Sequence, residues 1–321
     1  MRKVLFALIL FGTQLLTAQV DTTAIGVILE DIDQIESRFG PDSTFNWRSD
    51  YFFLTIDQRT KRTNELQQIV TRLRSLSPTN LSRQDQINRS VLLLKLENEV
   101  SQVFYKEYLM PFNAEGGFYN EGTFILSNRS FATASDYSDY ILWLKAYVKY
   151  LNFNLELLKT GVEEQVMRPK VIVQNTIKLL QPWVTNVNDH PFFQPLSTLS
   201  SNLTKAEKDQ ILKEGRSVIE HEVIVTYKEI LDFFMNTYLA ESPNEEGIST
   251  IKMGKEYYED RVRFFTTLNI SPDSVFRLGK SEVKRIKARM QEVITGLEYQ
   301  GDFDEFISFL RRDEQFYAGT P

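Results

Sequence analysis

Apolar residues recur every three or four positions along most of the chain, which is the spacing of one face of an α-helix. The first such segment, residues 22–39, places isoleucines at positions 25, 28, 32 and 35 and stops before Gly40-Pro41. The same pattern returns in residues 50–76, 82–109, 135–159, 169–184, 204–240 and 252–268, after Ser271-Pro272, and in 302–312. The pattern predicts an all-α fold built as a bundle of long helices.

Polar residues mark where several of these helices begin. Ser82 with Asp85 and Thr204 with Glu207 have the spacing of a capping box, in which residue and partner satisfy each other's backbone N–H groups. Ser271 stands before a proline, which is favoured in the first turn of a helix. We therefore expect helices to start at these three points.

One long stretch, residues 111–130, breaks the helical pattern. It contains Gly116-Gly117, Gly122 and several aromatic residues, and a loop of this length inside a compact domain is often functional. Residues 118–126 are the best strand candidate in the chain, so the stretch could hold one small hairpin.

Aromatic residues of this loop are candidates for a binding groove. Phe118, Tyr119 and Phe124 in the loop, with Tyr257 and Tyr258 further on, could line such a groove. Core packing explains aromatic residues at these positions equally well, because most such side chains are buried. Both interpretations stay open at the level of the sequence.

The first eighteen residues have the layout of a secretory signal peptide. Arg2 and Lys3 precede an apolar run over residues 4–16, and the small residue Ala18 follows as the expected cleavage point. The run is shorter than the roughly 20 residues that a membrane-spanning helix needs. We expect residues 1–18 to be removed and residues 19–321 to be a helical protein in the periplasm or outside the cell, with no membrane segment.

Composition excludes several kinds of chemistry. The chain has no cysteine, so disulfides, thiol nucleophiles and cysteine-ligated zinc are ruled out. The net charge of −6 is mild, and no basic stripe with interleaved aromatics occurs, so nucleic acid is not an expected partner. Residues 242–250 include an acidic, proline-containing break, which is the best candidate for a boundary between two halves.

The familiar catalytic motifs are incomplete or missing. His221-Glu222 could open the zinc-protease motif H-E-x-x-H, but the position that needs the second histidine holds Val225. His221 is therefore expected to face solvent, and His190, before Pro191, is expected in a turn. No G-x-S-x-G nucleophile turn occurs. We assign no catalytic residue and no metal ligand to this chain.

Segments after Pro243 are similar to a known family. Lys-Met-Gly-Lys-Glu-Tyr-Tyr at 252–258 and Phe-Thr-Thr-Leu-Asn-Ile-Ser-Pro at 265–272 resemble the bacterial domain of unknown function 885 family, DUF885. Leu278-Gly279, Glu282-Val283, Arg285-Ile286, Met290 and residues 301–313 continue the similarity. Asp136-Tyr137, Tyr140-Ile141 and Pro169 extend it more weakly toward the N-terminus.

The resemblance implies an α-helical, often exported protein similar to zinc metallopeptidases. The zinc motif of such proteins follows the region matched here, so the resemblance covers their N-terminal part only. It implies that Gly254, Tyr257 and Tyr258 belong to one wall of a peptide cleft, and that zinc is bound by a full-length relative and not by this chain. The chain would then be inactive alone.

The end of the chain points in the same direction. Thr320-Pro321 is how a helix starts, with threonine as the N-cap and proline at the first helical position. We therefore expect the C-terminus to be incomplete and a missing C-terminal half to pack against this chain. Two alternatives remain: a complete exported binding or scaffold protein without catalysis, and a metal-independent enzyme that uses Tyr and Glu side chains.

Overall fold

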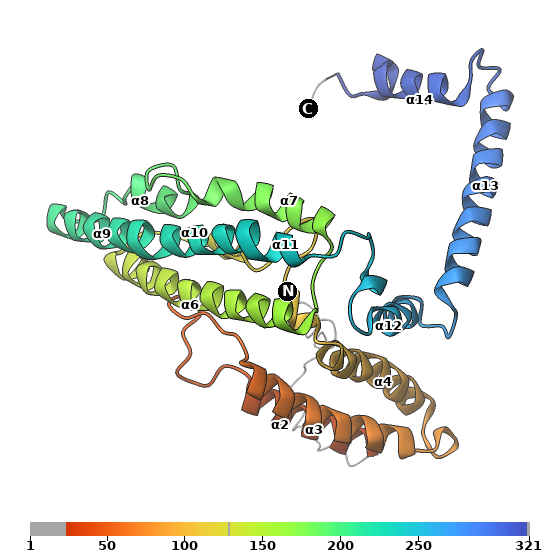
Figure 1. Ribbon diagram of the computed structural model, residues 1–321, viewed down its shortest axis with the longest axis horizontal. Helices are drawn as coiled ribbons and strands as arrows, with labels where there is room; N and C mark the ends of the chain where they lie inside the picture. Colours follow the sequence, from red (N-terminus) through yellow and green to blue (C-terminus); the bar gives the residue numbers. More distant parts are fainter. Residues whose placement is uncertain (1–23, 128, 320–321) are drawn as a thin grey trace, which may run out of the picture. The chain divides into compact units, whose positions relative to one another are not determined.

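The computed structural model describes residues 24–127 and 129–319 (Figure 1). The chain divides into two compact units: unit 1, Met1–Tyr257, and unit 2, Tyr258–Pro321. The expected signal peptide, residues 1–18, and the expected helix entry at Thr320-Pro321 lie outside the described residues. No helix among those described is both long and apolar enough to cross a membrane.

The described residues form helices and no strand, which confirms the all-α prediction. Unit 1 contains α2 (Ala24–Phe39), α3 (Ile56–Ser75), α4 (Arg83–Phe104), α5 (Glu121–Leu126), α6 (Ala134–Glu164), α7 (Lys170–Leu180), α8 (Gln194–Ser197), α9 (Lys205–Val218), α10 (Ile224–Phe233) and α11 (Leu239–Glu241). The helix α12 (Gly254–Thr266) spans the division, and unit 2 continues with α13 (Pro272–Gly296) and α14 (Phe303–Arg312).

The strand candidate at residues 118–126 is wrong, because α5 occupies most of it. What remains of the expected hairpin is a single antiparallel bridge between Phe112 and Gly117. A short apolar run can be either a strand or a segment of a buried helix, and periodicity does not tell the two apart. The packing of the loop against the rest of unit 1 decides between them.

Helices α9, α10 and α11 form one continuous rod. Two π-helical turns, Ile219–Val223 and Phe234–Tyr238, join them without interrupting the helix. The rod begins as predicted: the Thr204 hydroxyl accepts the Glu207 N–H at 3.3 Å, and the Glu207 carboxylate accepts the Thr204 N–H at 2.7 Å. The predicted start at Ser82 is also confirmed, since its hydroxyl accepts the N–H of Asp85.

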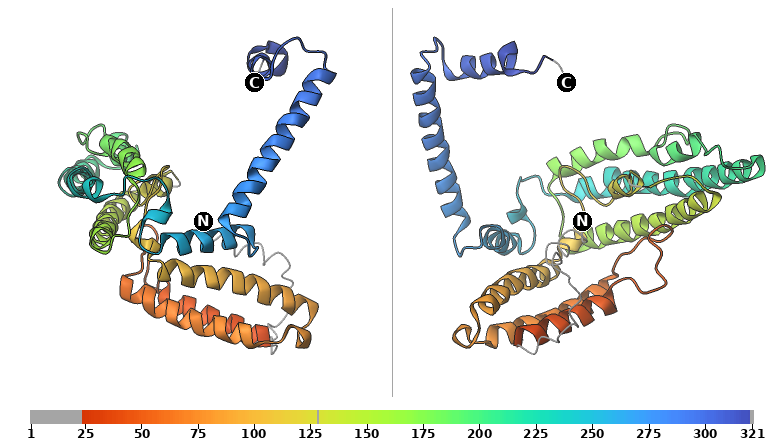
Figure 2. Two further views of the ribbon diagram at one scale, coloured as in Figure 1. Left: turned by 45° about the vertical axis from the view of Figure 1, so that its right-hand side comes forward. Right: turned by 180° about the vertical axis from the view of Figure 1, so that it is seen from behind.

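Helices α2, α3 and α4 pack together, and α2 does so through the isoleucine face that the sequence pattern predicted (Figure 2). Their core contains Ile25, Ile28, Ile32, Ile35, Leu66, Ile69, Val70, Leu73 and Leu96. The largely buried guanidinium of Arg62, on α3, pairs with Glu36 from α2 and Glu99 from α4. One cation therefore connects all three helices.

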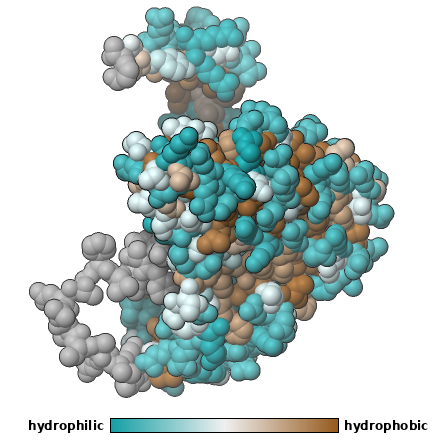
Figure 3. Space-filling view, turned by 90° about the vertical axis from the view of Figure 1, so that its left-hand side faces the viewer, coloured by the Kyte–Doolittle hydropathy of each residue, from teal (hydrophilic) through white to brown (hydrophobic). Residues whose placement is uncertain are grey.

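The main core of unit 1 lies between α6, α7 and the α9–α11 rod, which run side by side (Figures 1 and 2). Its largest fully buried side chains are aromatic: Trp143, Tyr119, Tyr137, Tyr140, Tyr147, Tyr227, Tyr238, Phe118, Phe192 and Phe234. Hydrophilic residues cover most of the face seen in Figure 3, with hydrophobic patches between them.

The break expected near residues 242–250 is the connection from α11 to α12. It is attached to unit 1, because the Lys170 N–H donates to the Pro243 carbonyl at 2.9 Å and Ile251 is buried with Leu109 and Met110. The division between units falls after it, at Tyr257.

Unit 2 has almost no core of its own. Among its described residues, 258–319, only Asp260 and Ile294 are buried. Helices of an ordinary small domain bury an apolar stripe against one another, and this burial supplies most of their stability. Most apolar side chains of unit 2 have no covering from within the unit.

Candidate functional site

The irregular stretch that the sequence marked as functional is fastened to the main core through its backbone. The Arg168 side chain donates to the carbonyls of Phe112 at 2.9 Å and Met110 at 3.3 Å, and Asn175 Nδ2 donates to the Ala114 carbonyl at 2.6 Å. Side-chain donors thus form hydrogen bonds to carbonyl groups that are not paired within a sheet or a helix. These contacts hold the loop in place.

A row of stacked rings on α6, the aromatic ladder, lies under the second part of the loop. It consists of Tyr140, Trp143, Tyr147 and Tyr150, which share one helix face because they are three or four positions apart. Trp143 and Tyr147 are nearly parallel, with ring centroids 5.2 Å apart and an angle of 7° between the planes. Phe192 meets both rings edge-on.

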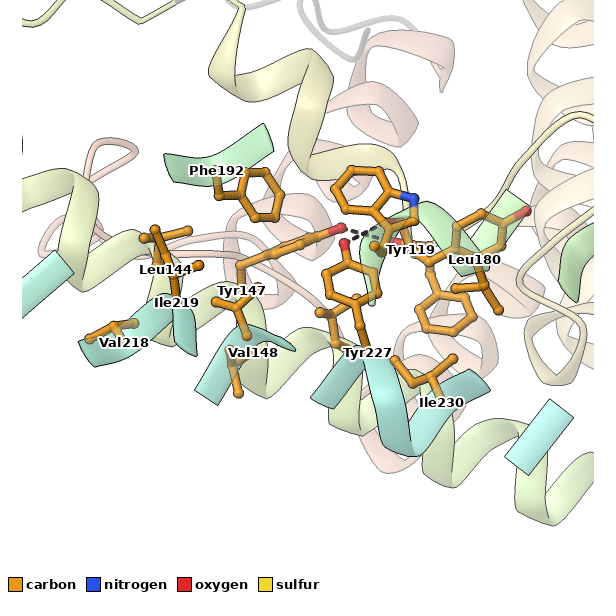
Figure 4. Close-up of a cluster of buried hydrophobic side chains, with 14 of the residues drawn as sticks. Tyr119, Leu144, Tyr147, Val148, Leu180, Phe192, Val218, Ile219, Tyr227 and Ile230 are labelled. Atoms are coloured by element: carbon orange, nitrogen blue, oxygen red, sulfur yellow. Dashed lines mark hydrogen bonds between the residues drawn. The ribbon is translucent and has the colours of Figure 1, made fainter. Parts of the chain in front are cut away.

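Buried tyrosine hydroxyls tie the loop to α6 and α10 (Figure 4). The Tyr147 hydroxyl donates to the Phe118 carbonyl at 3.0 Å and accepts the Gly122 N–H at 3.2 Å. The Tyr227 hydroxyl donates to the Tyr119 carbonyl at 2.6 Å. Burial raises the pKa of Tyr147 and of Tyr227, so both stay neutral donors. Their chemistry here is anchoring, because neither becomes a nucleophilic phenolate.

Glu121 forms a polar cluster at the outer end of the ladder. Its carboxylate accepts hydrogen bonds from the hydroxyls of Tyr51 at 2.9 Å and Tyr150 at 3.0 Å. Burial, reinforced by the negative charge of Glu121, raises the pKa of both tyrosines. The cluster joins the segment before α3 to α5 and α6. No sequence pattern indicates this cluster, because Tyr51 and Glu121 are 70 positions apart.

Phe118 and Tyr119 occupy the core and not a surface. Their side chains are 0 % and 1 % exposed, and both belong to the main aromatic cluster. Of the two interpretations that the sequence left open, core packing describes this position. Contact between a peptide and these two side chains would require the loop to move.

Phe124, in α5, is 68 % exposed, and three further expected groove residues lie at the start of α12. Tyr257 is buried, with its ring 5.5 Å from that of Tyr105, whereas Tyr258 is 49 % exposed. Gly254 closes the turn that opens the helix, and its N–H donates to the Ile251 carbonyl at 2.9 Å. A role of α12 in binding peptide stays a prediction.

We expect Gly254→Ala to destabilise unit 1 by about 2 kcal/mol, the cost of overpacking a close contact. A Cβ atom there would lie 1.8 Å from the Ile248 carbonyl oxygen, so the backbone of the turn would have to move. Chemical denaturation followed by circular dichroism measures the change.

Gly279→Ala is the matched control. A Cβ at Gly279, inside α13, meets nothing within 4 Å, so alanine should be neutral or slightly stabilising there. Equal effects of the two substitutions would show that the turn is not tightly packed.

The two histidines occupy opposite environments. His221 is exposed on the α9–α11 rod, as predicted, and His190 is in a turn, also as predicted, but it is buried. His190 Nδ1 accepts the Phe192 N–H at 3.2 Å. Burial lowers the pKa of His190 to about 4, with the backbone of Trp183 opposing the shift in part. This imidazole is neutral at physiological pH.

The described residues do not offer a fitting zinc site. No three His, Cys, Asp or Glu residues in that part of the chain lie where they could share a metal ion. Structural and catalytic zinc sites need three or four such ligands. We therefore derive no chemical step through zinc in this chain.

The model of one protein family matches residues 50–321, which is most of the chain. Its description is "Bacterial protein of unknown function (DUF885)". The chain belongs to the DUF885 family. The resemblance noted in the segments after Pro243 is thereby confirmed at the level of the family, and it extends through α3, α4, α6 and the α9–α11 rod.

A solved structure has the same fold as this DUF885 chain. It is described as the crystal structure of the putative lipoprotein from Colwellia psychrerythraea, with a TM-score of 0.66 and 18 % identity. The match covers 90 % of this chain and 52 % of that one, so the DUF885 chain spans about half the length of that relative. No curated protein matches the chain.

Proposed function

We propose that this chain is the N-terminal helical portion of an exported, metallopeptidase-like DUF885 protein. In this proposal it supplies one wall of a peptide cleft, and a further part of the protein supplies the zinc ligands. The chain has two histidines and no cysteine, and its described residues hold no cluster that could bind a metal. A hydrolase built on zinc would therefore need ligands from elsewhere.

The observation that carries the proposal is the nearly coreless unit 2. A unit with two buried residues in its described part cannot draw its stability from its own packing. The structural relative is longer, and 90 % of this chain matches 52 % of it. Both facts fit a chain whose C-terminal helices complete their packing with further protein.

The start of α12 is the part of the wall that we propose contacts peptide. Tyr258 presents a half-exposed phenol ring there. The preceding residue, Tyr257, is buried and packs its ring against that of Tyr105. An exposed tyrosine on a rigid helix suits peptide binding, since its ring gives contact area and its hydroxyl a hydrogen bond. Gly254 fixes the turn from which the helix begins.

The decisive experiment is to read the gene beyond the codon for Pro321 and to assay the whole product for peptidase activity. We expect a continuing frame that encodes a His-Glu helix, and cleavage that a chelator abolishes and zinc restores. Tyr258→Ala should then raise KM several-fold more than it lowers kcat, because it would remove a substrate contact. A stop codon together with no cleavage would contradict the proposal and leave an exported binding protein.

A further inference from the structure

Helix α13 carries an apolar seam, defined here as its exposed apolar side chains at alternating intervals of three and four residues. The seam consists of Phe276, Val283, Ile286, Met290, Val293 and Leu297, with Gly279 at the one small position. These side chains are between 41 % and 67 % exposed. An interval that alternates between three and four residues is how a helix packs along another helix.

The two edges of the seam differ in charge. One edge carries Arg277, Lys280, Lys284 and Lys287, and its one acidic residue, Asp273, lies in the first turn of the helix before them. No salt bridge in the described part of the chain neutralises the three lysines. On the other edge the charges are already paired: Glu282 with Arg285 at 2.7 Å, and Arg289 with Glu292 at 2.7 Å. Only the basic edge therefore has unpaired charges that could bind a partner.

We infer that the seam of α13 is a docking surface for an amphipathic helix with acidic residues beside its apolar stripe. The occupant is a helix from the part of the family fold that this chain does not span. This inference rests on the proposed function, because it identifies where the further part of the protein would pack. The gap at Gly279 would receive a large side chain of that helix.

A second copy of this chain fits the seam less well. In an antiparallel pair, the lysine edges of two α13 helices would face each other and repel. In a parallel pair, the basic edge would meet Glu282 of the other copy, which Arg285 already neutralises. A partner from the rest of the fold can instead present unpaired carboxylates.

The test uses the whole chain and two synthetic helical peptides of four heptads. Both peptides have leucine at the two stripe positions of each heptad, and one has glutamate and the other lysine at the flanking positions. We expect the glutamate peptide to bind about tenfold more tightly, since several exposed pairs change from attraction to repulsion. Fluorescence anisotropy of labelled peptide measures both affinities.

Variants of α13 locate the binding. Val283→Glu with Ile286→Glu should abolish binding, and Ser281→Glu, on the opposite face, should leave it unchanged. Lys280→Glu with Lys287→Glu should reverse the preference toward the lysine peptide. All these positions are at most partly covered, so the helix itself should persist in each variant.

A thiol footprint gives a second readout, because the chain contains no cysteine. The thiol of Val283→Cys should react with a maleimide reagent in the free chain. Its reaction rate should fall several-fold when the glutamate peptide is bound. Ser281→Cys should react equally in both states.

Three results would overturn the inference. These are equal affinity for the two peptides, binding that survives the Val283→Glu and Ile286→Glu changes, and a dimer of the chain that those changes dissociate. None of these results depends on peptidase activity. Docking can therefore fail while the zinc-dependent assay of the whole product succeeds, or the reverse.

Discussion

Replacing Trp143 by alanine should lower the free energy of unfolding of unit 1 by about 4 kcal/mol. Trp143 is buried at the centre of the aromatic ladder, stacked on Tyr147 and Tyr140, and Arg129 lies 4.8 Å above its ring. Truncation of a buried tryptophan costs the lost transfer free energy and leaves a cavity, together about 3–5 kcal/mol. For a unit of this size the melting temperature should fall by about 10 °C.

Trp47→Ala is the control for this prediction. Trp47 is 62 % exposed and contacts Phe45 in the connection between α2 and α3. A surface substitution of this kind should change stability by no more than about 0.5 kcal/mol. Differential scanning calorimetry of both variants compares them directly. If Trp143→Ala were as mild as Trp47→Ala, the ladder would not be the centre of the core.

Acidification from pH 6.5 to pH 4 should cost unit 1 about 3 kcal/mol through His190 alone. The pKa of His190 is lowered to about 4 in the folded state, against 6.5 for an unperturbed histidine. Between pH 6.5 and pH 4, His190 is protonated in the unfolded chain but mostly unprotonated in the folded chain. The stabilisation is therefore complete above pH 6.5, decreases as the pH falls, and stops decreasing below pH 4.

His190→Asn isolates this contribution. Asparagine can still accept the Phe192 N–H through its side-chain oxygen, as His190 Nδ1 does, but it does not titrate. Urea unfolding of the variant at the two pH values should therefore show about 3 kcal/mol less acid sensitivity than the native chain. His221→Asn, on the exposed face of the rod, should keep the native sensitivity. The same sensitivity in His190→Asn would mean that another group is responsible.

The chain belongs to the DUF885 family, and its described residues form no metal-binding cluster. Unit 1 is held by an extensive aromatic core, so it can fold around its own residues. The seam of α13 in unit 2 is exposed, and we propose that a further part of the protein covers it. The candidate residues of α12, Gly254, Tyr257 and Tyr258, lie in its first turns.

Local features of the sequence were sufficient to locate the long helices, although not the short helices α5 and α8. The Thr204–Glu207 capping box acts within four residues, and the apolar face of α2 repeats within one helix, so neither needs a distant partner. The missing histidine at Val225 similarly excludes one zinc motif without any structure. The family resemblance depended on contiguous segments after Pro243, which can be read directly.

Contacts between residues far apart in the chain could not be predicted from the sequence alone. The hydroxyl of Tyr227 reaches the Tyr119 carbonyl across 108 positions, and this contact helps to bury a loop whose composition suggested an exposed groove. Periodicity does not say which element covers which face, because burial depends on the whole set of packed neighbours. The sequence by itself determined the long helices, the apolar face of α2 and the family. Only the tertiary structure decided that Phe118 and Tyr119 lie in the core while the equally apolar face of α13 stays uncovered within its unit.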